Sequence, residues 1–452
     1  MNADILQKYS VAVPRYTSYP TVPYWNVKSF NSNIWKNQVQ AAFIQSNGKN
    51  GISLYIHLPY CENLCTYCAC NKRITKNHQV ELPYINAVIA EWNIYKKLFK
   101  GVPNIKEIHL GGGTPTFFSP KNLEILINGI LENCDIHPKA EFSFEAHPSN
   151  TSYQQLKTLY DLGFRRLSLG IQDFDLAVQK IINRVQSVEQ VESVTEQART
   201  IGYTSINYDF IYGLPLQTIK SLKETIEKVV ALKPDRIAFY GYAHVPWVKS
   251  GQRKFTEDDL PNTQTRQLLY ETGRNDLAAA NYFDIGMDHF SLITDSLYKA
   301  AQNQKIHRNF MGYTHQYTQL MIGLGVSSIS DSWFAFAQNV KNEEEYLSLI
   351  NNGDLPVFKG HLLSDEDLLI RKHILNIMCN GETTWTKEEL ANHNFKNSIC
   401  LLDELIADGI ITRTDHSLKV TDEGKRFLRN VCAVFDAKLR EKLPEKQVFS
   451  LG

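Results

Sequence analysis

The chain has 452 residues, with 48 lysines and arginines balanced by 48 aspartates and glutamates, so its formal net charge is zero. This length exceeds the size at which a single hydrophobic core stops growing, and it predicts one large domain with smaller additions. The balanced charge argues against a protein that binds nucleic acid through bulk positive charge, and the 43 % content of hydrophobic residues indicates a folded globule.

Residues 1–50 are predicted to form an irregular, aromatic-rich arm. The opening stretch, MNADILQKYSVAVPRYTSYP, is polar with scattered charge and lacks the apolar run and cleavage site of a secretory signal. No apolar stretch of the chain approaches the ~20 residues of a membrane-spanning helix. We therefore expect a cytoplasmic protein, in which clustered cysteines are metal ligands or redox groups rather than disulfides.

From residue 51 onward, short apolar or β-branched runs alternate with helical stretches. The expected strands are 52–59, 106–113, 141–148, 165–172, 205–215 and 236–246. The expected helices are 83–99, 120–133, 152–162, 187–201 and 218–231. Strand–helix units in this order predict an α/β fold with a parallel sheet and right-handed crossovers. Because the count is six strands rather than eight, we expect an incomplete (β/α)6 TIM-like barrel over 51–361, extension included, with its chemistry at the C-terminal strand ends.

The pattern changes at about residue 362. Three helical stretches, two short strands around Asp415 and His416 and a closing helix predict a mainly helical, winged-helix-like domain over 362–452. Such modules often bind DNA, but the candidate recognition helix, NSICLLDELIADG (397–409), carries three acidic residues and no lysine or arginine. Without cationic side chains it would lack the main driving force for groove binding. A packing or covering role is therefore favoured.

Four of the eight cysteines lie in one loop after the first strand, YCENLCTYCACNKR (60–73). The other four, Cys134, Cys379, Cys400 and Cys432, stand in apolar helical context and are expected to be buried small hydrophobes. A zinc site is the alternative for the loop, but zinc knuckles need a distant second pair of ligands that this chain lacks. Three thiolates on a short loop suit three irons of a cubane cluster and leave the fourth iron open. The spacing therefore indicates a reactive cluster.

Polar groups and glycines stand where the predicted strands end. Gly111, Gly112 and Gly113 close the second strand and permit close approach of a ligand. Glu145, Gln172 and Asp209 end the next three strands, and Arg184 is expected on the helical segment after the fourth strand. In a barrel these groups would face one cavity. Periodicity alone leaves open whether each is a ligand or a satisfied polar lining residue.

The spacing C-x3-C-x2-C after the first strand, with Tyr67 before the third cysteine, resembles the radical S-adenosylmethionine superfamily. The motifs PRYTSYP, CACNK, HLGGGTPT, FEAHP, GIQDF, YDFIYGLPLQT and HRNFMGYT resemble, in that order, the oxygen-independent coproporphyrinogen III oxidases of heme biosynthesis. The resemblance runs from about residue 8 to about residue 440. The paralogous heme chaperones are similar too, but they typically carry an aromatic residue where Cys70 stands and tend to lack the PRYTSYP arm. A heme-binding chaperone without porphyrinogen turnover is therefore the alternative.

The resemblance implies a set of ligands. Cys61, Cys65 and Cys68 would hold one [4Fe–4S] cluster per chain, and Cys70 would be an active-site thiol. Two S-adenosylmethionine molecules would bind side by side. The first would contact Tyr55, Gly112, Glu145 and Ile329. The second would contact Tyr67, Gly113, Thr114, Gln172, Arg184, Asp209 and Ala243. Ala69 and His147 depart from the pattern of the family, and we assign no role to His147.

The resemblance also implies the reaction. A 5′-deoxyadenosyl radical would remove a hydrogen atom from a propionate, and loss of carbon dioxide and one electron would leave a vinyl group. Two such steps would convert coproporphyrinogen III to protoporphyrinogen IX. The four carboxylates of this substrate need cationic partners, for which Arg15 and Arg308 are the candidates. We further expect a monomer that uses a low-potential electron donor and binds neither nucleic acid nor a membrane.

Overall fold

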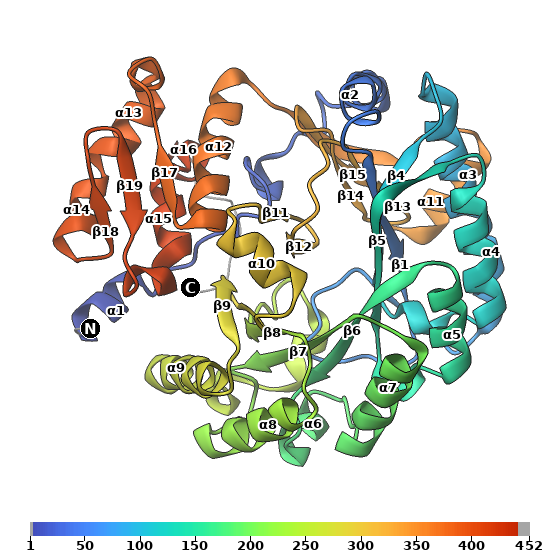
Figure 1. Cartoon of the computed structure of the whole chain (residues 1–452), viewed down its shortest axis with the longest axis horizontal. Helices are drawn as coiled ribbons and strands as arrows, with labels where there is room; N and C mark the ends of the chain where they lie inside the picture. Colours follow the sequence, from blue (N-terminus) through green and yellow to red (C-terminus); the bar gives the residue numbers. More distant parts are fainter. Residues whose placement is uncertain (1–2, 442–452) are drawn as a thin grey trace.

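The computed structural model describes residues 3–441, and a twelve-stranded sheet forms its centre (Figure 1). The six predicted strands are β1 (Ile52–Leu58), β4 (Asn104–Gly112), β5 (Asp135–Ala146), β6 (Phe164–Gln172), β7 (Ser205–Tyr212) and β8 (Arg236–Gly241). Each pairs in parallel with the next. The prediction of an α/β fold with a parallel sheet is therefore confirmed.

The sheet extends beyond the predicted strands at both edges. A seventh parallel strand, β13 (Met321–Leu324), pairs with β1 on the side away from β4. The antiparallel strands are β14 (Ile329–Asp331), β15 (Ala335–Asn339) and β16 (Val357–Leu362) beyond β13, and β10 (His289–Ser291) and β9 (Phe283–Gly286) beyond β8. Within the described residues the edge strands β16 and β9 do not pair with each other, so the curved sheet stays open.

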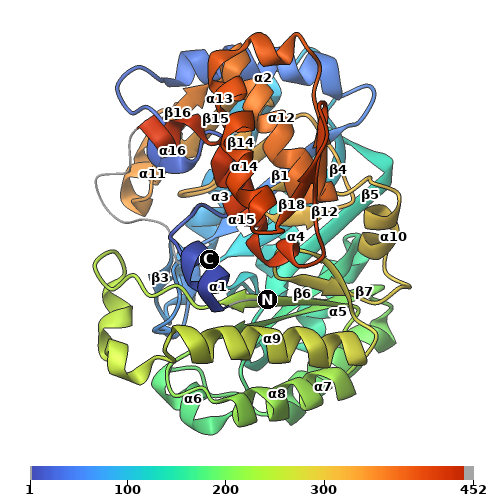
Figure 2. The same ribbon diagram turned by 90° about the vertical axis from the view of Figure 1, so that its left-hand side faces the viewer.

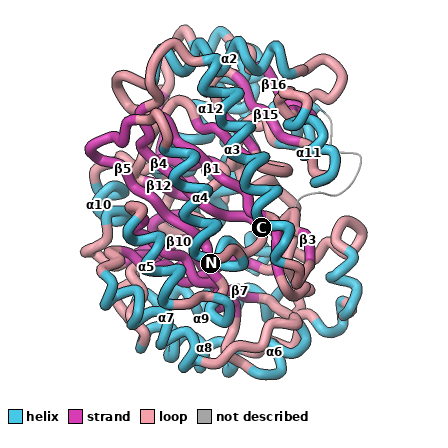
Figure 3. The backbone as a smooth tube through the Cα atoms, turned by 90° about the vertical axis from the view of Figure 1, so that its right-hand side faces the viewer, coloured by secondary structure: helices cyan, strands magenta, loops and turns pink. Residues whose placement is uncertain are grey.

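Helices cover the outer, convex face of the sheet (Figure 3). The five predicted ones are α3 (Glu81–Leu98), α4 (Pro120–Leu131), α5 (Tyr153–Asp161), α7 (Val188–Ile201) and α8 (Ile219–Ala231). Capping boxes at Ser152, Ser187 and Thr218 fix where three of them begin. Each of the five helices carries the chain back to the start of the next strand. The C-terminal ends of the parallel strands therefore all lie on one side of the sheet.

The expectation of an irregular N-terminal arm was wrong in part. The arm contains α1 (Ala3–Tyr9) and the 15-residue α2 (Ser32–Ser46). The Asn31 side chain caps α2, and Trp35, Val39 and Phe43 form its buried stripe at helical spacing. Further along the chain, α6 (Leu176–Ile181) and α9 (Thr263–Ala279) were not predicted either.

The C-terminal region has the expected order of a winged helix. It contains α12 (Asp365–Asn380), β17 (Glu382–Thr384), α13 (His393–Cys400), α14 (Leu402–Ala407), β18 (Ile411–Arg413), β19 (Ser417–Val420) and α15 (Leu428–Phe435). The predicted recognition helix is broken at Leu401 into α13 and α14. The second of the three predicted helical stretches, TKEELANHNF (386–395), forms only a 3-10 turn, Glu389–Ala391, before α13 begins at His393. Cys400, at the end of α13, is exposed, contrary to expectation, whereas Cys432 is buried and Cys134 and Cys379 are partly buried.

The arm and the C-terminal region share one hydrophobic core. Tyr16 and Tyr19 are buried against residues of α12 to α15. Tyr9 of α1 donates to the Asp408 carboxylate at 2.6 Å, and this contact places α1 beside the C-terminal helices (Figure 2). Nothing among the described helices is long and apolar enough to cross a membrane. The remaining elements are β2 (Tyr60–Cys61), β3 (Arg73–Ile74), α10 (Ser296–Gln302), β11 (His307–Asn309), β12 (Gly312–Thr314), α11 (Glu343–Asn351) and α16 (Ala437–Glu441).

Candidate functional site

A cavity of about 190 Å³ lies inside the curve of the sheet. Its polar lining on β4 to β7 consists of His109, Ser143, Glu145, Arg166, Ser168, Asn207 and Asp209. Side chains two residues apart on a strand point to the same face, which is why Asn207 and Asp209 both reach the cavity. Two of the sequence-predicted residues, Glu145 and Asp209, are thereby brought together.

Glu145 is held by groups from the neighbouring strand β4. Its Oε2 accepts a hydrogen bond from the Gly112 N–H at 3.3 Å, and its Oε1 lies 3.5 Å from His109 Nε2. Burial alone would raise the pKa of Glu145, but the interactions with His109 and the Gly112 N–H lower it below its usual value. The carboxylate is therefore ionised at neutral pH and can accept hydrogen bonds from a polar ligand.

The glycine-rich turn after β4 fits closely around β1. Gly112 has a φ of +117°, and a Cβ there would lie 2.7 Å from the His57 ring. His57 interacts through Nε2 with the Asn71 carbonyl at 2.8 Å and through Nδ1 with the Tyr55 hydroxyl at 3.0 Å. The Tyr55 side chain is thus oriented by His57, a residue that the sequence did not single out although it lies two positions further on the same strand.

Ile329 lies near Tyr55 across the unpredicted edge of the sheet. Tyr55 is opposite Gly323 in the parallel pairing of β1 with β13. A Cβ on Gly323 would lie 2.5 Å from the Ile329 carbonyl oxygen on β14. Ile329 on β14 is therefore one strand beyond Gly323, the residue opposite Tyr55, and lies close to the other residues proposed to bind the first S-adenosylmethionine.

The cysteine loop follows β1 and borders the glycine-rich turn. The Cys61 Sγ lies 3.2 Å from the Thr114 hydroxyl, and Thr114 N donates to the Tyr60 carbonyl at 2.9 Å. The Cys65 Sγ accepts from Arg184 Nη1 at 3.7 Å. Beyond Cys68, the exposed Cys70 has a pKa well above its usual value, first because of the hydrogen bond between the two thiols. The loop thus presents its sulfur atoms beside the predicted cofactor residues.

The donor set fits a cubane cluster better than a single ion. In the described part of the chain, no three histidine, cysteine or acidic side chains are close enough together to hold one metal ion. A [4Fe–4S] cluster needs a wider arrangement, because each thiolate binds a different iron. Three free thiols on one loop, Cys61, Cys65 and Cys68, meet that requirement.

Gln172 and Arg184 meet beside Gly170 on β6. A Cβ on Gly170 would lie 2.6 Å from Gln172 Nε2 and 2.7 Å from Arg184 Nη2, and Arg184 also donates to the Gly170 carbonyl at 2.7 Å. Arg184 was expected on a helical segment, but it lies in the loop between α6 and α7, because α6 already ends at Ile181. Its buried Nε has no hydrogen-bond partner among the described residues and is free to bind a ligand.

Gln252 joins two further predicted residues. Its Nε2 donates to the carbonyl oxygens of Tyr67 and Ala243, each at 3.1 Å, and its side chain is fully buried. The end of β8 is thereby attached to the cysteine loop. Sequence patterns could not identify Gln252, because it lies in an irregular segment and its partners are distant in the sequence.

Asp209 has two supporting residues that were not predicted. Ser168 donates to its Oδ2 and Asn207 donates to its Oδ1, each at 2.8 Å. Burial is the main reason that the pKa of Asp209 is raised to about 6. The alternation of side chains along β6 and β7 could have predicted that Ser168 and Asn207 lie on the cavity face. It could not have predicted their hydrogen bonds to Asp209.

Arg15 and Arg308 lie together behind two tyrosines of the cavity lining, Tyr240 and Tyr313. Arg308 donates from Nη2 to the Arg15 carbonyl at 3.2 Å and lies 4.6 Å from the centre of the Tyr313 ring. The Arg15 guanidinium pairs with Asp288 and lies 5.3 Å from the Tyr240 ring. Both tyrosines line the cavity. Arg308 is 4 % exposed, and its Nε and Nη1 lack hydrogen-bond partners in the described structure.

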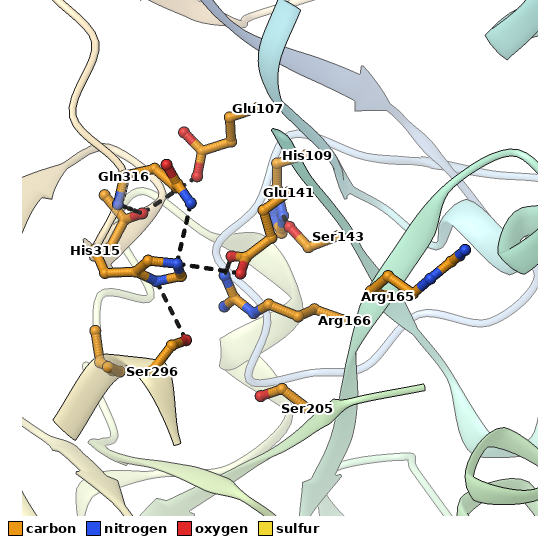
Figure 4. Close-up of polar contacts among 12 residues, drawn as sticks. Glu107, His109, Glu141, Ser143, Arg165, Arg166, Ser205, Ser296, His315 and Gln316 are labelled. Atoms are coloured by element: carbon orange, nitrogen blue, oxygen red, sulfur yellow. Dashed lines mark hydrogen bonds and ion pairs between the residues drawn. The ribbon is translucent and has the colours of Figure 1, made fainter. Parts of the chain in front are cut away.

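The floor of the cavity is closed by paired charges (Figure 4). Arg166 forms an ion pair with Glu141, whose Oε2 lies 3.3 Å from His315 Nε2. Arg236 pairs through Nε with Asp295 at 2.7 Å. Each of these charged groups has a partner within the protein. These ion pairs are therefore structural, whereas Arg184 and Arg308 carry nitrogens without a partner among the described residues.

His147, to which no role was assigned, has a partner as well, because its Nδ1 accepts a hydrogen bond from Ser149 N at 3.2 Å.

Comparison with known proteins gives a consistent result. The model of the radical SAM superfamily matches residues 55–229. The chain is 38 % identical to the oxygen-independent coproporphyrinogen III oxidase of Helicobacter pylori, covering 96 % of both chains, and 35 % identical to that of Pseudomonas aeruginosa, covering 96 % of this chain and 95 % of the relative. The solved coproporphyrinogen III oxidase of Escherichia coli, described as a radical SAM enzyme, superposes with a TM-score of 0.88 at 33 % identity, covering 94 % of this chain and 98 % of that one.

Proposed function

The chain belongs to the oxygen-independent coproporphyrinogen III oxidases of the radical SAM superfamily, and we propose that it converts two propionate side chains of coproporphyrinogen III to vinyl groups. It is thus an oxidoreductase of heme biosynthesis that uses a [4Fe–4S] cluster and S-adenosylmethionine. When bound, these groups supply a 5′-deoxyadenosyl radical that takes a hydrogen atom from a propionate. Loss of carbon dioxide and of one electron to an acceptor leaves the vinyl group, and two rounds give protoporphyrinogen IX.

One structural observation supports the proposal most directly. The carboxylate of Glu145, in the cavity wall, bonds to the Gly112 N–H of the same turn whose Thr114 contacts Cys61. The thiol loop, the glycine-rich turn and the polar cavity are therefore one continuous site. In that site Cys61, Cys65 and Cys68 would hold the cluster, and Cys70 would remain as a free thiol beside it.

Two molecules of S-adenosylmethionine are proposed for this site. The first would lie against Tyr55, Gly112, Glu145 and Ile329, on the β1 side. Glu145 is ionised and could accept hydrogen bonds from ribose hydroxyls or the adenine amino group. The bare backbone of Gly112 allows a ligand to come close to the cluster loop.

The second molecule would lie on the β6 to β8 side. Its proposed contacts are Tyr67, Gly113, Thr114, Gln172, Arg184, Asp209 and Ala243. The free Nε of Arg184 supports this assignment, since a buried guanidinium nitrogen without a partner can bind the carboxylate of the methionine moiety. The two supporting bonds on Asp209 fix its carboxylate for a polar ligand group.

The substrate carboxylates are assigned to Arg308 and Arg15. Arg308 is the stronger candidate, because two of its nitrogens lack partners and its guanidinium packs on a tyrosine of the cavity wall. Guanidinium groups bind carboxylates bidentately, and the low dielectric of a buried site strengthens the bond. Arg15 would act while remaining paired with Asp288.

The arm (1–50) and the C-terminal domain (362–452) are proposed to cover the barrel (51–361). Tyr16 and Tyr19 of the arm are buried in the C-terminal core, which supports a common role in shielding the site. A cover excludes water and stray hydrogen donors from carbon radicals. We propose a cytoplasmic monomer that receives electrons from a low-potential donor, since free thiols and an open iron need a reducing compartment.

An anaerobic product assay tests the function. With dithionite, excess S-adenosylmethionine and an electron acceptor, the purified protein is expected to consume coproporphyrinogen III and form protoporphyrinogen IX. About two 5′-deoxyadenosine molecules should accompany each product, because each decarboxylation begins with one hydrogen abstraction. Stoichiometric binding of heme without consumption of porphyrinogen would favour the chaperone alternative instead.

A further inference from the structure

Exposed apolar side chains gather beside the cysteine loop. Leu64, Val185 and Val248 are 39 %, 60 % and 52 % exposed, respectively, although each lies in a loop next to the proposed cluster ligands. Single exposed apolar residues are common on protein surfaces, but contiguous groups of them mark interaction sites. It therefore matters whether these three residues form one surface.

Contacts between the three loops that carry them bring these residues close together. The Asn183 side chain donates to the Leu64 carbonyl at 2.8 Å, and Thr66 N donates to the Ile182 carbonyl at 3.0 Å. A Cβ placed on Gly251 would lie 3.7 Å from a methyl group of Leu64. The segments that carry Leu64, Val185 and Val248 are thus packed side by side around the cysteine loop.

Lysines flank this apolar group. Lys72 donates from Nζ to the Cys68 carbonyl at 3.1 Å, and Lys72 and Lys341 line the same shallow groove. Lys249 directly follows Val248 in the chain and is partly buried, so a third ammonium group lies on the segment that carries Val248. Glu343 and Glu344 also line the groove, but both pair with Arg73.

The lysines of this region, Lys72, Lys249 and Lys341, unlike Arg73, form no ion pair with an acidic side chain among the described residues. The chain as a whole has no net charge, so this concentration is a local feature rather than a general one. We call Leu64, Val185, Val248, Lys72, Lys249 and Lys341 the loop-side surface.

We propose that the loop-side surface docks a small acidic electron-carrier protein. The inference rests on the proposed function, since the docked carrier would pass one electron to the cluster held by the adjacent cysteines. The flavin or iron–sulfur group of the carrier is oxidised by one electron, the cluster is reduced by one, and no bond forms or breaks. A small apolar centre flanked by complementary charge is typical of short-lived redox complexes, whose interfaces are small.

The test measures binding as well as electron delivery, with reduced flavodoxin as the probe. The variant K249E/K341E reverses two charges and leaves Lys72 in place, because Lys72 bonds to the cysteine loop. The dissociation constant for flavodoxin should rise about 10-fold or more, and the wild-type complex should weaken with added salt. Turnover driven by dithionite, a small reductant that needs no docking, should stay within about twofold of wild type.

A matched control changes the same charge elsewhere. K100E/K139E reverses two exposed lysines at the N-terminal ends of the strands, away from the cysteine loop, and should leave flavodoxin binding unchanged. Val248→Asp should weaken binding without changing turnover with dithionite. K249Q/K341Q, which only neutralises the charges, should give a smaller effect of the same sign and serves if the double reversal fails to fold.

Two results would overturn the proposal. Unchanged flavodoxin binding in K249E/K341E would show that this surface is not the docking site. An equal loss of turnover with dithionite would show that the lysines bind substrate carboxylates instead. Failure of the proposed function would look different, because the wild-type protein would then consume no porphyrinogen with dithionite at all.

Discussion

The hydroxyl of Ser168 on β6 donates a hydrogen bond to Oδ2 of Asp209 on β7 at 2.8 Å, although 41 residues separate them. The Asn207 amide bonds to both partners, to Ser168 Oγ and to Asp209 Oδ1, again at 2.8 Å. The three side chains form a closed triangle in the cavity wall. The orientation of the Asp209 carboxylate is therefore set by its neighbours before any ligand binds.

Replacing Asn207 by leucine should weaken binding of S-adenosylmethionine. The change removes two hydrogen bonds at similar side-chain size. The bond to the Asp209 carboxylate alone is of a kind that contributes about 1.5–3 kcal/mol, so affinity should fall about 10-fold or more. Equilibrium dialysis under anaerobic conditions measures the affinity, and iron and sulfide analysis serves as control. Unchanged affinity with a full cluster would show that Asp209 needs no such support.

Serine substitutions should separate the roles of the four loop cysteines. Cys61→Ser, Cys65→Ser and Cys68→Ser each remove a proposed ligand and should lose the cluster, whereas Cys70→Ser should keep about four irons and four sulfides per chain but form no product. Visible absorption after anaerobic reconstitution follows the cluster. Loss of iron in Cys70→Ser would contradict the role assigned to this residue, and stoichiometric zinc would contradict the cluster itself.

Substitution of Arg308 should act on substrate binding. Arg308→Met should raise KM for coproporphyrinogen III about 10- to 100-fold, since one charge-assisted pair is lost, and Arg308→Lys should recover only part because lysine lacks the bidentate fork. Steady-state kinetics gives KM, and thermal unfolding checks that the buried site still folds. Arg413→Met, on a strand of the C-terminal domain, is the control. Equal effects of both substitutions on KM would argue against a specific carboxylate site.

Glu91 should make the stability of the protein depend on pH. Its pKa is raised to about 7, first by burial, although Gly325 N, Asn339 and Tyr346 all donate to it. The native state thus binds more protons than the unfolded state between about pH 4.5 and 7, so this group lowers the free energy of unfolding as pH rises.

The variant Glu91→Gln removes that titration. Wild type should lose stability relative to the variant as the pH rises from 4.5 to 7.5, by at most about 3 kcal/mol in the free energy of unfolding. A separate loss, the same at every pH, is expected in the variant because its amide donor would face the Asn339 donor. Urea unfolding of the cluster-free protein at several pH values measures this. An unchanged difference across the range would mean that the pKa of Glu91 is not raised in the native protein above its value in the unfolded chain.

The barrel was predictable because its units repeat. Each of the six predicted parallel strands is a compact apolar run, and the first five are each followed by a helix that the pattern also places. The unpredicted parallel strand β13 is only MIGL, four residues with a glycine, and its partner β1 lies over 260 residues earlier, so local pattern could not reveal the pairing. By contrast, the stripe of Trp35, Val39 and Phe43 in α2 was visible in the sequence and was overlooked among the aromatic residues of the arm.

Of the site, the sequence predicted the polar residues at the strand ends but not the residues that hold them in place. Glu145 and Asp209 end strands, and a barrel brings strand ends together, so their meeting follows from topology. The bond from Ser168 to Asp209 and the bond from Gln252 to the Tyr67 carbonyl do not follow from topology, because each joins residues far apart in sequence through side-chain geometry that no spacing records. The closeness of Arg15 to Arg308, 293 residues apart, likewise depends on how the arm folds back onto the barrel.

The central claim is that this chain starts its reaction by taking hydrogen from a propionate of coproporphyrinogen III. The most direct measurement uses substrate deuterated at the propionate β-carbons, in an anaerobic reaction with S-adenosylmethionine and dithionite. Mass spectrometry of the 5′-deoxyadenosine formed should show one deuterium per molecule, together with vinyl product. Unlabelled 5′-deoxyadenosine, with the propionates intact, would contradict the claim.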